Sequence, residues 1–340
     1  MAAYTTIDNL ELYFQCKLYT GNGTAIGSGG QAVTLDGDED MQPDLVWIKD
    51  RTDSDRPRLF DAVRGVTKEL DTSDNTAETT LTEGLTAFGS DGFTVGNHEG
   101  VNSNTDSFVA WCWKESADAG MDIVSYTGNA TNRTISHSLS AVPHLMLIKN
   151  RDSARNWVVY HHKNTSTPQN DRLLLNTNDA TDSSDAEFND TAPTSSVFTV
   201  GTGNSPNESG DKIISYLFSE KQGYSMFGKF EGNNSTDGAF VYLGFRPAWV
   251  MIKSSATGGS NYDWVIFDNK RNTGNVNDDF LDANLANAEV TSGRNEVDFL
   301  SNGFKCRSSY GDVNSNTTYI YLAFAEAPFV NSNGVPCNAR

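Results

Sequence analysis

The same three sequence anchors occur three times along this chain of 340 residues, about 100 residues apart. The first anchor is an apolar run with proline six positions before lysine, at residues 43–49, 143–149 and 247–253. The second is a strand-like segment around a phenylalanine (Phe93, Phe198, Phe304), and the third is an aromatic run that ends in glutamate (Glu115, Glu220, Glu326). Three anchors in a constant order predict a triplicated domain.

The spacing of the anchors divides the chain into five parts. We expect an N-terminal leader, three repeats and a C-terminal tail, at residues 1–17, 18–117, 118–221, 222–328 and 329–340. A unit of about 100 residues is long enough to bury a hydrophobic core. The leader carries Ile7, Leu10 and Phe14 and is too apolar for a free tail. It either packs on repeat 1 or anchors the protein to a partner.

The apolar segments are short and rich in valine, isoleucine, threonine and aromatic residues, and Asn-Gly, Asp-Gly and Gly-Asn pairs separate them. This pattern is typical of strands joined by turns. The sequence therefore predicts an all-β protein made of three tandem lectin-like or jelly-roll β-sandwich repeats. Trp47, Leu147 and Met251 should hold equivalent strand positions, because each lies two residues before the repeated lysine. The phenylalanine of the second anchor should be buried in every repeat.

The composition is strongly acidic, with 25 Lys and Arg against 44 Asp and Glu and a formal net charge of −19. Nucleic-acid binding requires a clustered basic face, which this sequence lacks, so we expect no nucleic-acid partner. No apolar run approaches the roughly 20 residues that span a bilayer, so we expect no membrane insertion. The N-terminus also lacks the basic start and apolar stretch of a secretory signal.

Patterns for metal or cofactor binding are weak. The four cysteines have no CxxC spacing, which favours free thiols over a disulfide or zinc framework. Residues 36–40 are dense in carboxylates, but Met41 stands where an EF-hand requires glycine. The segments that we align with this loop, residues 136–139 and 239–242, carry no carboxylate. We expect a solvated turn there, and we predict no cofactor and no metal site.

The repeated polar residues are Lys49, Glu115 and their counterparts. We interpret them as structural charges at strand ends, with a cross-strand ion pair, rather than as an acid–base pair in triplicate. The chain has no GxSxG, HExxH or Walker motif. His161 and His162 are adjacent on a predicted strand, so their rings should point to opposite faces, and we assign them to no site shared by the repeats. The prediction is a protein that is not an enzyme and has no catalytic residues.

Aromatic residues are abundant and could form a sugar-binding platform. Because most of them lie in segments that recur between repeats, we favour packing in the core and predict no specific ligand-binding residue. The residues concerned are Trp111, Trp113, Trp157, Trp249, Trp264, Tyr160 and Tyr262.

Several segments near the start of the chain carry a family resemblance. They are residues 4–9, 12–15, 18–22, 38–49, 59–65, 90–96 and 109–114, the fifth of which is Leu59-Phe-Asp-Ala-Val-Arg-Gly65. Together they resemble a repeated, uncharacterised domain of virion proteins from marine tailed bacteriophages. The resemblance is specific over residues 4–115 and weaker in repeats 2 and 3, whose aromatic strand departs from the Phe-Asp-x-Val-Arg-Gly form.

The resemblance implies a non-enzymatic structural protein of the virion, in a tail fibre or another appendage, with other virion proteins as partners. It also implies a homo-oligomer, and a trimer is the leading prediction because such appendages often have threefold symmetry. A carbohydrate-binding host-adhesion protein, with a host surface glycan as partner, and a capsid-surface decoration protein are the alternatives. A polysaccharide depolymerase would need two carboxylates about 5 to 9.5 Å apart in a groove, and no such pair stands out in the sequence.

Overall fold

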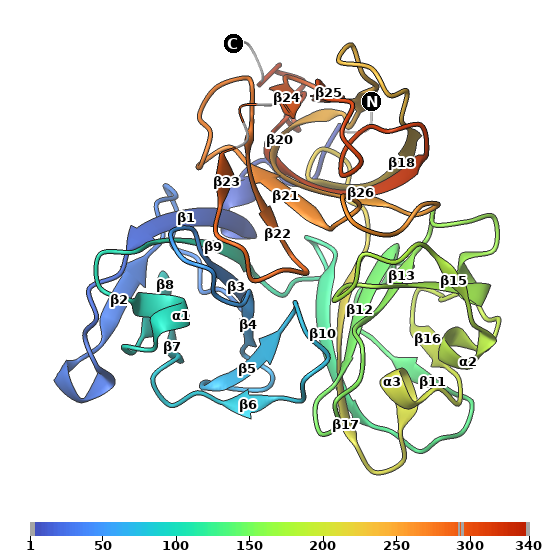
Figure 1. The fold of residues 1–340 in the computed structure, drawn as a ribbon, viewed down its shortest axis with the longest axis horizontal. Coiled ribbons are helices and arrows are strands. Elements are labelled where there is room, and N and C mark those ends of the chain that lie inside the picture. Colours follow the sequence, from blue (N-terminus) through green and yellow to red (C-terminus); the bar gives the residue numbers. More distant parts are fainter. Residues whose placement is uncertain (1–3, 292, 294–295, 338–340) are drawn as a thin grey trace.

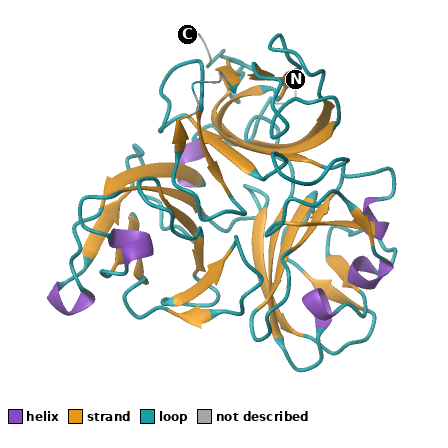
Figure 2. Cartoon of the chain, viewed as in Figure 1, coloured by secondary structure: helices purple, strands orange, loops and turns teal. Residues whose placement is uncertain are grey.

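The computed structural model describes residues 4–291, 293 and 296–337, and its regular structure is almost entirely β (Figures 1 and 2). The described helices are single turns: α1 (Glu99–Asn102), α2 (Asp185–Phe188), α3 (Asn204–Asn207) and the 3-10 helices η1 (Leu10–Leu12), η2 (Ile26–Ser28) and η3 (Pro168–Asn170). The prediction of an all-β protein is confirmed.

Each repeat builds one six-stranded antiparallel sheet, and the strand order is the same in all three. In repeat 1 the order is β1 (Phe14–Thr20), β9 (Ser107–Trp113), β3 (Leu45–Asp50), β4 (Arg58–Asp61), β5 (Lys68–Asp71) and β6 (Thr79–Thr80). In repeat 2 it is β10 (Met121–Thr127), β17 (Lys212–Phe218), β12 (Leu145–Asn150), β13 (Val158–His161), β14 (Asp171–Leu174) and β15 (Asp182–Ser183). In repeat 3 it is β18 (Ser225–Glu231), β26 (Thr318–Pro328), β20 (Phe245–Ser254), β21 (Val265–Asp268), β22 (Asp279–Asp282) and β23 (Val290–Thr291). The first and last long strands of a repeat are thus always neighbours.

A smaller antiparallel sheet packs on the outer face of each large sheet and completes a sandwich. It consists of β2 (Gln31–Thr34), β8 (Gly92–Val95) and β7 (Leu85–Gly89) in repeat 1, of β11 (Arg133–Ser136) and β16 (Val197–Val200) in repeat 2, and of β19 (Phe240–Tyr242), β25 (Gly303–Cys306) and β24 (Val297–Leu300) in repeat 3. Phe93, Phe198 and Phe304 lie between the sheets and are at most 3% exposed. The predicted burial of these phenylalanines is confirmed.

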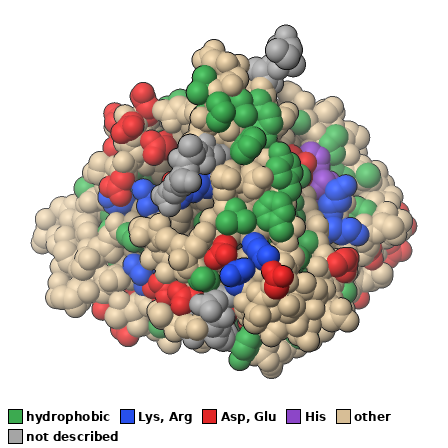
Figure 3. Space-filling model, turned by 90° about the horizontal axis from the view of Figure 1, so that it is seen from above, with side chains coloured by type: hydrophobic (Ala, Val, Ile, Leu, Met, Phe, Trp, Pro, Cys, Tyr) green, Lys and Arg blue, Asp and Glu red, His purple; other side chains and the backbone are tan. Residues whose placement is uncertain are grey.

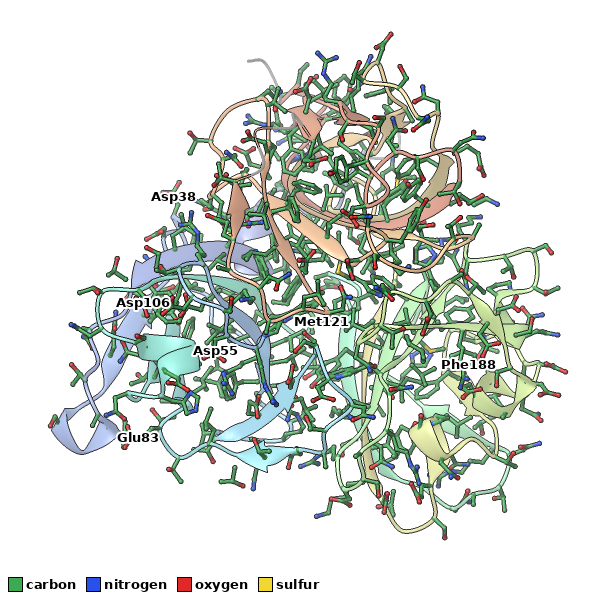
Figure 4. The ribbon with its side chains drawn as sticks, in the orientation of Figure 1. Asp38, Asp55, Glu83, Asp106, Met121 and Phe188 are labelled. Carbon is green, nitrogen blue, oxygen red and sulfur yellow. The ribbon has the colours of Figure 1, made fainter. Side chains whose placement is uncertain are left out.

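The other face of each large sheet points to the centre of the molecule, where the three sheets share one hydrophobic core. Trp47, Leu147 and Met251 hold equivalent places in β3, β12 and β20, as predicted, and together with other side chains of all three repeats they line a central apolar cavity of about 20 Å³. Figure 4 shows Met121, at the start of β10, near the middle of the molecule, and Phe188 within repeat 2 alone. Because side chains alternate along a strand, the first anchor is apolar on both faces: one faces the centre and the other its own sandwich.

The leader belongs to the central core. Ile7, Leu10 and Phe14 are at most 4% exposed, and Phe14 stacks on Phe324 of β26 with ring centroids 5.3 Å apart. Strand β1 begins at Phe14, so the expected boundary after residue 17 falls inside a strand. Of the two alternatives for the leader, the structure shows packing, and this packing joins repeat 1 to repeat 3.

The glycine turn that follows the first strand is held in the same way in each repeat. A Cβ added to Gly21, Gly128 or Gly232 would lie 2.0 Å from a backbone oxygen of the loop before the closing strand, so only glycine fits there. The backbone N–H after each glycine donates to the side-chain oxygen of a buried asparagine at 2.7, 3.0 and 3.1 Å, and these acceptors are Asn102, Asn207 and Asn314. The turn therefore clamps the first strand to its neighbour.

Candidate functional site

The lysine that ends the first anchor is fully buried in every repeat, with Lys49, Lys149 and Lys253 each 0% exposed. Lys49 Nζ donates to the backbone oxygen of Ala286 in repeat 3 at 3.2 Å, and Lys149 Nζ donates to that of Asn75 in repeat 1 at 2.9 Å. Burial lowers the pKa of each lysine to about 8. The first two of these amines thus tie their strand to a loop of another repeat.

The glutamate that ends the third anchor contacts the following repeat in repeats 1 and 2, whereas Glu326 pairs with Arg246 of its own repeat at 2.8 Å. Glu115 Oε1 accepts a hydrogen bond from the Ile123 backbone N–H at 3.2 Å, and Glu220 Oε1 accepts one from that of Phe227 at 3.0 Å. The two donors belong to β10 and β18, the first strands of repeats 2 and 3, so each glutamate binds the first strand of the next repeat. The expected cross-strand ion pair is wrong, because Lys49 and Glu115 lie toward opposite ends of the β3–β9 pair.

Repeat 1 meets repeat 2 through a buried network of charged residues. Asp61 and Arg64, whose side chains are both 0% exposed, form an ion pair, and Tyr216 of repeat 2 donates its hydroxyl hydrogen to Asp61 Oδ2 at 2.6 Å. Arg64 also contacts Glu78 at 3.2 Å, and Glu78 accepts two hydrogen bonds from Arg151 of repeat 2, at 2.7 and 2.9 Å. Every charge in this network faces an opposite one, as a buried position requires.

Repeat 3 meets repeat 1 through the same arrangement. Arg271 Nε donates to Asp268 Oδ2 at 2.6 Å, and Trp111 Nε1 of repeat 1 donates to the same oxygen at 3.1 Å. Arg271 contacts Glu289 at 3.0 Å, and Glu289 pairs with Arg51 of repeat 1 at 2.6 Å. Burial alone would raise the pKa of the Asp268 carboxyl, but the charge and hydrogen bonds of Arg271 hold it below its ordinary value.

Repeat 2 meets repeat 3 without the charged network. His161 takes the place of Asp61, since the two pair in register with the first residues of β12 and β3. The His161 Nδ1 accepts from the Lys163 backbone N–H at 3.2 Å, so its Nε2 carries the proton that it shares with the Tyr321 backbone oxygen at 3.3 Å. The assignment of His161 to no shared site is therefore wrong, because the residue occupies a position that all three junctions use.

One backbone hydrogen bond recurs at all three junctions and identifies the other equivalent residues. The backbone N–H of Glu78 donates to the backbone oxygen of Arg151 at 2.8 Å. In the same way Glu289 donates to Arg51 at 3.0 Å, and Thr181 donates to Ser255 at 2.8 Å. Repeat 2 thus has threonine where the other repeats have glutamate, and repeat 3 has serine where they have arginine. Asn164 likewise stands in the place of Arg64 and accepts from the Thr181 hydroxyl at 2.6 Å. The junctions form a closed cycle in which two contain the charged network, and the third has uncharged residues at the equivalent positions and is called the neutral junction below.

The neutral junction should be the acid-sensitive one. Burial lowers the pKa of His161 to about 3, whereas an unfolded histidine titrates near 6.5. As pH falls below about 6.5 the unfolded chain binds a proton that the folded chain does not, so folding stability decreases. Replacing His161 with glutamine should remove this loss, and the wild type should lose about 2 kcal/mol more than the variant between about pH 7.5 and about pH 5.

Urea denaturation of both proteins at the two pH values measures this difference. Glu115 and Asp282, whose pKa values burial raises to about 7, titrate in the opposite direction, but they are common to both proteins and cancel. A His137→Gln variant, altered outside the junctions, serves as the matched control and should keep the wild-type pH dependence. Equal slopes for wild type and His161→Gln would show that His161 is not held neutral.

The acidic loop at residues 36–40 is exposed, apart from a half-buried position, and Figure 4 shows Asp38 at the outer surface of repeat 1. In the described part of the chain, no group of three or more His, Cys, Asp or Glu residues is placed to hold a metal ion. Strand β19 pairs with β25 as β2 pairs with β8, so residues 240–242 correspond to part of β2 and not to the acidic loop. Our alignment of residues 239–242 with this loop was wrong.

The aromatic residues considered as a sugar platform are mostly in the core. All of them except Tyr262 are at most 4% exposed, namely Trp111, Trp113, Trp157, Trp249, Trp264 and Tyr160. The indoles of Trp157 and Trp264 donate to backbone oxygens of a neighbouring repeat at 2.7 and 3.0 Å. The four cysteines are free thiols, of which Cys16, Cys112 and Cys306 are buried.

Sequence reasoning missed the junction residues, although a pattern for them exists. The spacing Asp-x-x-Arg occurs at residues 61–64 and 268–271, and His-x-x-Asn replaces it at residues 161–164. This pattern identifies the junction residues only when it is compared with the facing residues of the neighbouring repeat, which are Arg151, Arg51 and Ser255 and which change together with it.

Comparison with known proteins places this arrangement in one family. A family model described as a domain of unknown function, DUF7483, matches residues 11–328, which include all three large sheets. No curated protein and no solved structure matches the chain.

Proposed function

This chain belongs to the DUF7483 family, and we propose that it is a non-enzymatic structural protein of a bacteriophage virion, located in a tail fibre or another appendage. The observation that carries the proposal is the shared core, into which all three repeats and the leader pack. A structural part of a particle must keep its shape under load, and a single core bounded by three junctions makes the three sandwiches one rigid block. The phage setting rests on the resemblance of residues 4–115.

The surface charge supports a role at high local concentration. A net charge of −19 keeps copies of the protein apart in solution and hinders non-specific association before assembly. Asp38 of repeat 1 is exposed, and Figure 4 shows it at the outer edge of that repeat. From the family resemblance we expect other virion proteins as partners and a homo-oligomer with a trimer favoured, and from the acidic composition we expect no nucleic-acid partner. No helix in the described residues is long and apolar enough to cross a membrane.

Particle composition tests the proposal. Purified phage particles, separated from host lysate on a density gradient, should contain the chain in a fixed copy number by quantitative mass spectrometry. Gold-labelled antibody against the folded chain should mark a tail or appendage in electron micrographs. Labelling of the head surface instead would favour the capsid-decoration alternative. Presence in infected-cell lysate together with absence from purified particles would contradict a virion role.

A further inference from the structure

Two exposed aromatic side chains of repeat 3 have no counterpart in the other repeats. Phe240 and Tyr242 of β19 are 48% and 53% exposed, while Val241 between them is 6% exposed. Strand β19 lies at the edge of its sheet. The corresponding positions, identified by strand pairing with the buried phenylalanines, are Ala32 and Thr34 in β2 and Thr134 and Ser136 in β11. The shared fold therefore does not require aromatic residues there.

The end of the molecule formed by repeat 3 carries a band of hydrophobic side chains with a histidine close to it (Figure 3). Phe240 and Tyr242 are the most exposed aromatic side chains among the described residues. An aromatic ring that is half exposed on an edge strand loses favourable burial unless something covers it. Its repeat-specific presence thus points to a ligand.

A cavity of about 430 Å³ opens beside Tyr242, at the boundary of repeats 2 and 3. Its wall combines the phenol rings of Tyr4 and Tyr242 and the side chain of Met226 with the polar groups of His144 and Glu220. The volume falls within the roughly 300–1,000 Å³ of typical small-molecule sites. The cavity at the corresponding boundary of repeats 3 and 1 is only about 110 Å³.

The polar part of the wall offers both a donor and an acceptor. His144 Nδ1 accepts the backbone N–H of Glu220 at 2.9 Å, which places the proton of the neutral ring on Nε2. Burial, reinforced by the neighbouring His162, lowers the pKa of His144, so the ring is neutral at physiological pH. Glu220 uses Oε1 for the Phe227 backbone N–H at 3.0 Å, and its second oxygen remains an acceptor.

This combination matches a hydroxyl-rich ligand. A hydroxyl group both donates and accepts, as the Nε2–H of His144 and the carboxylate of Glu220 require. The apolar C–H face of a pyranose ring can lie against an aromatic ring such as that of Tyr242. Burial alone would raise the pKa of Glu220, but His162 and the backbone hydrogen bond lower it, so the wall is anionic and disfavours an acidic ligand.

We propose that the cavity between repeats 2 and 3, together with the aromatic pair Phe240 and Tyr242, binds a neutral saccharide. The inference goes beyond the structural role proposed above, since a virion component can fulfil that role without binding sugar. It also assigns one site to the chain, because Phe240 and Tyr242 occur in one repeat only. Binding to a surface glycan of the host is the use that such a site would serve.

A glycan array of neutral and acidic oligosaccharides, probed with the folded full-length chain, is the first test. Calorimetric titration with the best neutral oligosaccharide should then give saturable binding with one site per chain. The double variant Phe240→Thr/Tyr242→Ser introduces residues of the kind that repeat 2 has at these positions, so it should fold normally and bind at least about tenfold more weakly, a loss of about 1.4 kcal/mol. Val63→Thr, which alters a 45% exposed residue of repeat 1, is the matched control and should bind as the wild type does.

Three results would overturn the inference. They are the absence of binding to any neutral glycan, unchanged affinity of the double variant, and tighter binding of choline or of an acidic oligosaccharide than of any neutral one. Circular dichroism and thermal melting of each variant ensure that a loss of binding is not a loss of folding. Particle composition, measured separately, decides the structural role, so failure of one proposal is distinguishable from failure of the other.

Discussion

Replacing Asp61 with alanine should lower the free energy of unfolding by about 3–5 kcal/mol, because the fully buried guanidinium of Arg64 then loses its nearest counter-charge. The hydroxyl of Tyr216 in repeat 2 loses its acceptor in the same step. Guanidinium-induced unfolding, followed by far-ultraviolet circular dichroism and by tryptophan fluorescence, measures the change. Asp38→Ala, in the exposed loop of repeat 1, is the matched control and should alter stability by no more than about 0.5 kcal/mol.

The double variant Asp61→Ala/Arg64→Met separates the two origins of this loss. Removing both charges leaves no unpaired cation in the core, so the double variant should be less destabilised than the sum of the two single variants. A loss below about 1 kcal/mol for Asp61→Ala would mean that water reaches the junction and screens Arg64. Additive single effects would mean that the two residues act independently.

Replacing Trp249 with alanine should also cost about 3–5 kcal/mol, through lost burial and the cavity that remains. Trp249 is 1% exposed, and its ring centroid lies 6.3 Å from that of Trp111 and 5.8 Å from those of Trp113 and Phe324. Trp111 and Trp113 belong to repeat 1, so the substitution in repeat 3 should weaken both repeats. Hydrogen exchange with mass spectrometry should show faster exchange in β9 of repeat 1 as well as in β20.

Phe198→Ala provides the comparison for that experiment. Phe198 is fully buried, but it lies in the outer core of repeat 2 and contacts no other repeat through that core. Its loss should raise exchange first in β11 and β16. If Trp249→Ala affected repeat 3 alone, the central core would not couple the repeats.

The strands could be predicted because their causes are local. Turn glycines, β-branched residues and the alternation around Phe93, Phe198 and Phe304 lie within a few residues of one another, and the triplication repeated each observation. The two-sided apolar character of the first anchor likewise followed from its sequence. What that pattern could not show is that the second face packs against other repeats, since a central strand of an isolated sandwich would look the same.

The junctions escaped prediction because their partners are far apart in the chain. Asp61 meets Tyr216 across 155 positions and Trp111 meets Asp268 across 157, and no local pattern encodes such a contact. His161 was excluded from a shared site because it differs in type from Asp61 and Asp268. His161 can occupy the same position as Asp61 and Asp268 because the facing repeat has Ser255 where the other junctions have an arginine. Only the folded chain shows that these residues face each other.

The neutral junction has a consequence for the order of the repeats. At each junction one sandwich contributes the side with Asp61 and Glu78 or their equivalents, and its neighbour contributes the residue equivalent to Arg51. In repeat 2 the first of these sides carries His161 and Thr181, so it lacks the carboxylates that the arginines of repeats 1 and 2 would need. The side of repeat 3 that faces repeat 2 has Ser255 in place of an arginine, so opposite Glu78 or Glu289 it would leave that glutamate without its arginine from the facing repeat. The mismatch penalises a ring in which the three repeats follow one another in a different order. Although the three large sheets have the same strand order, only one order of the repeats around the core satisfies all three junctions. The molecule therefore presents three different outer faces, in one fixed order, to any partner that it binds.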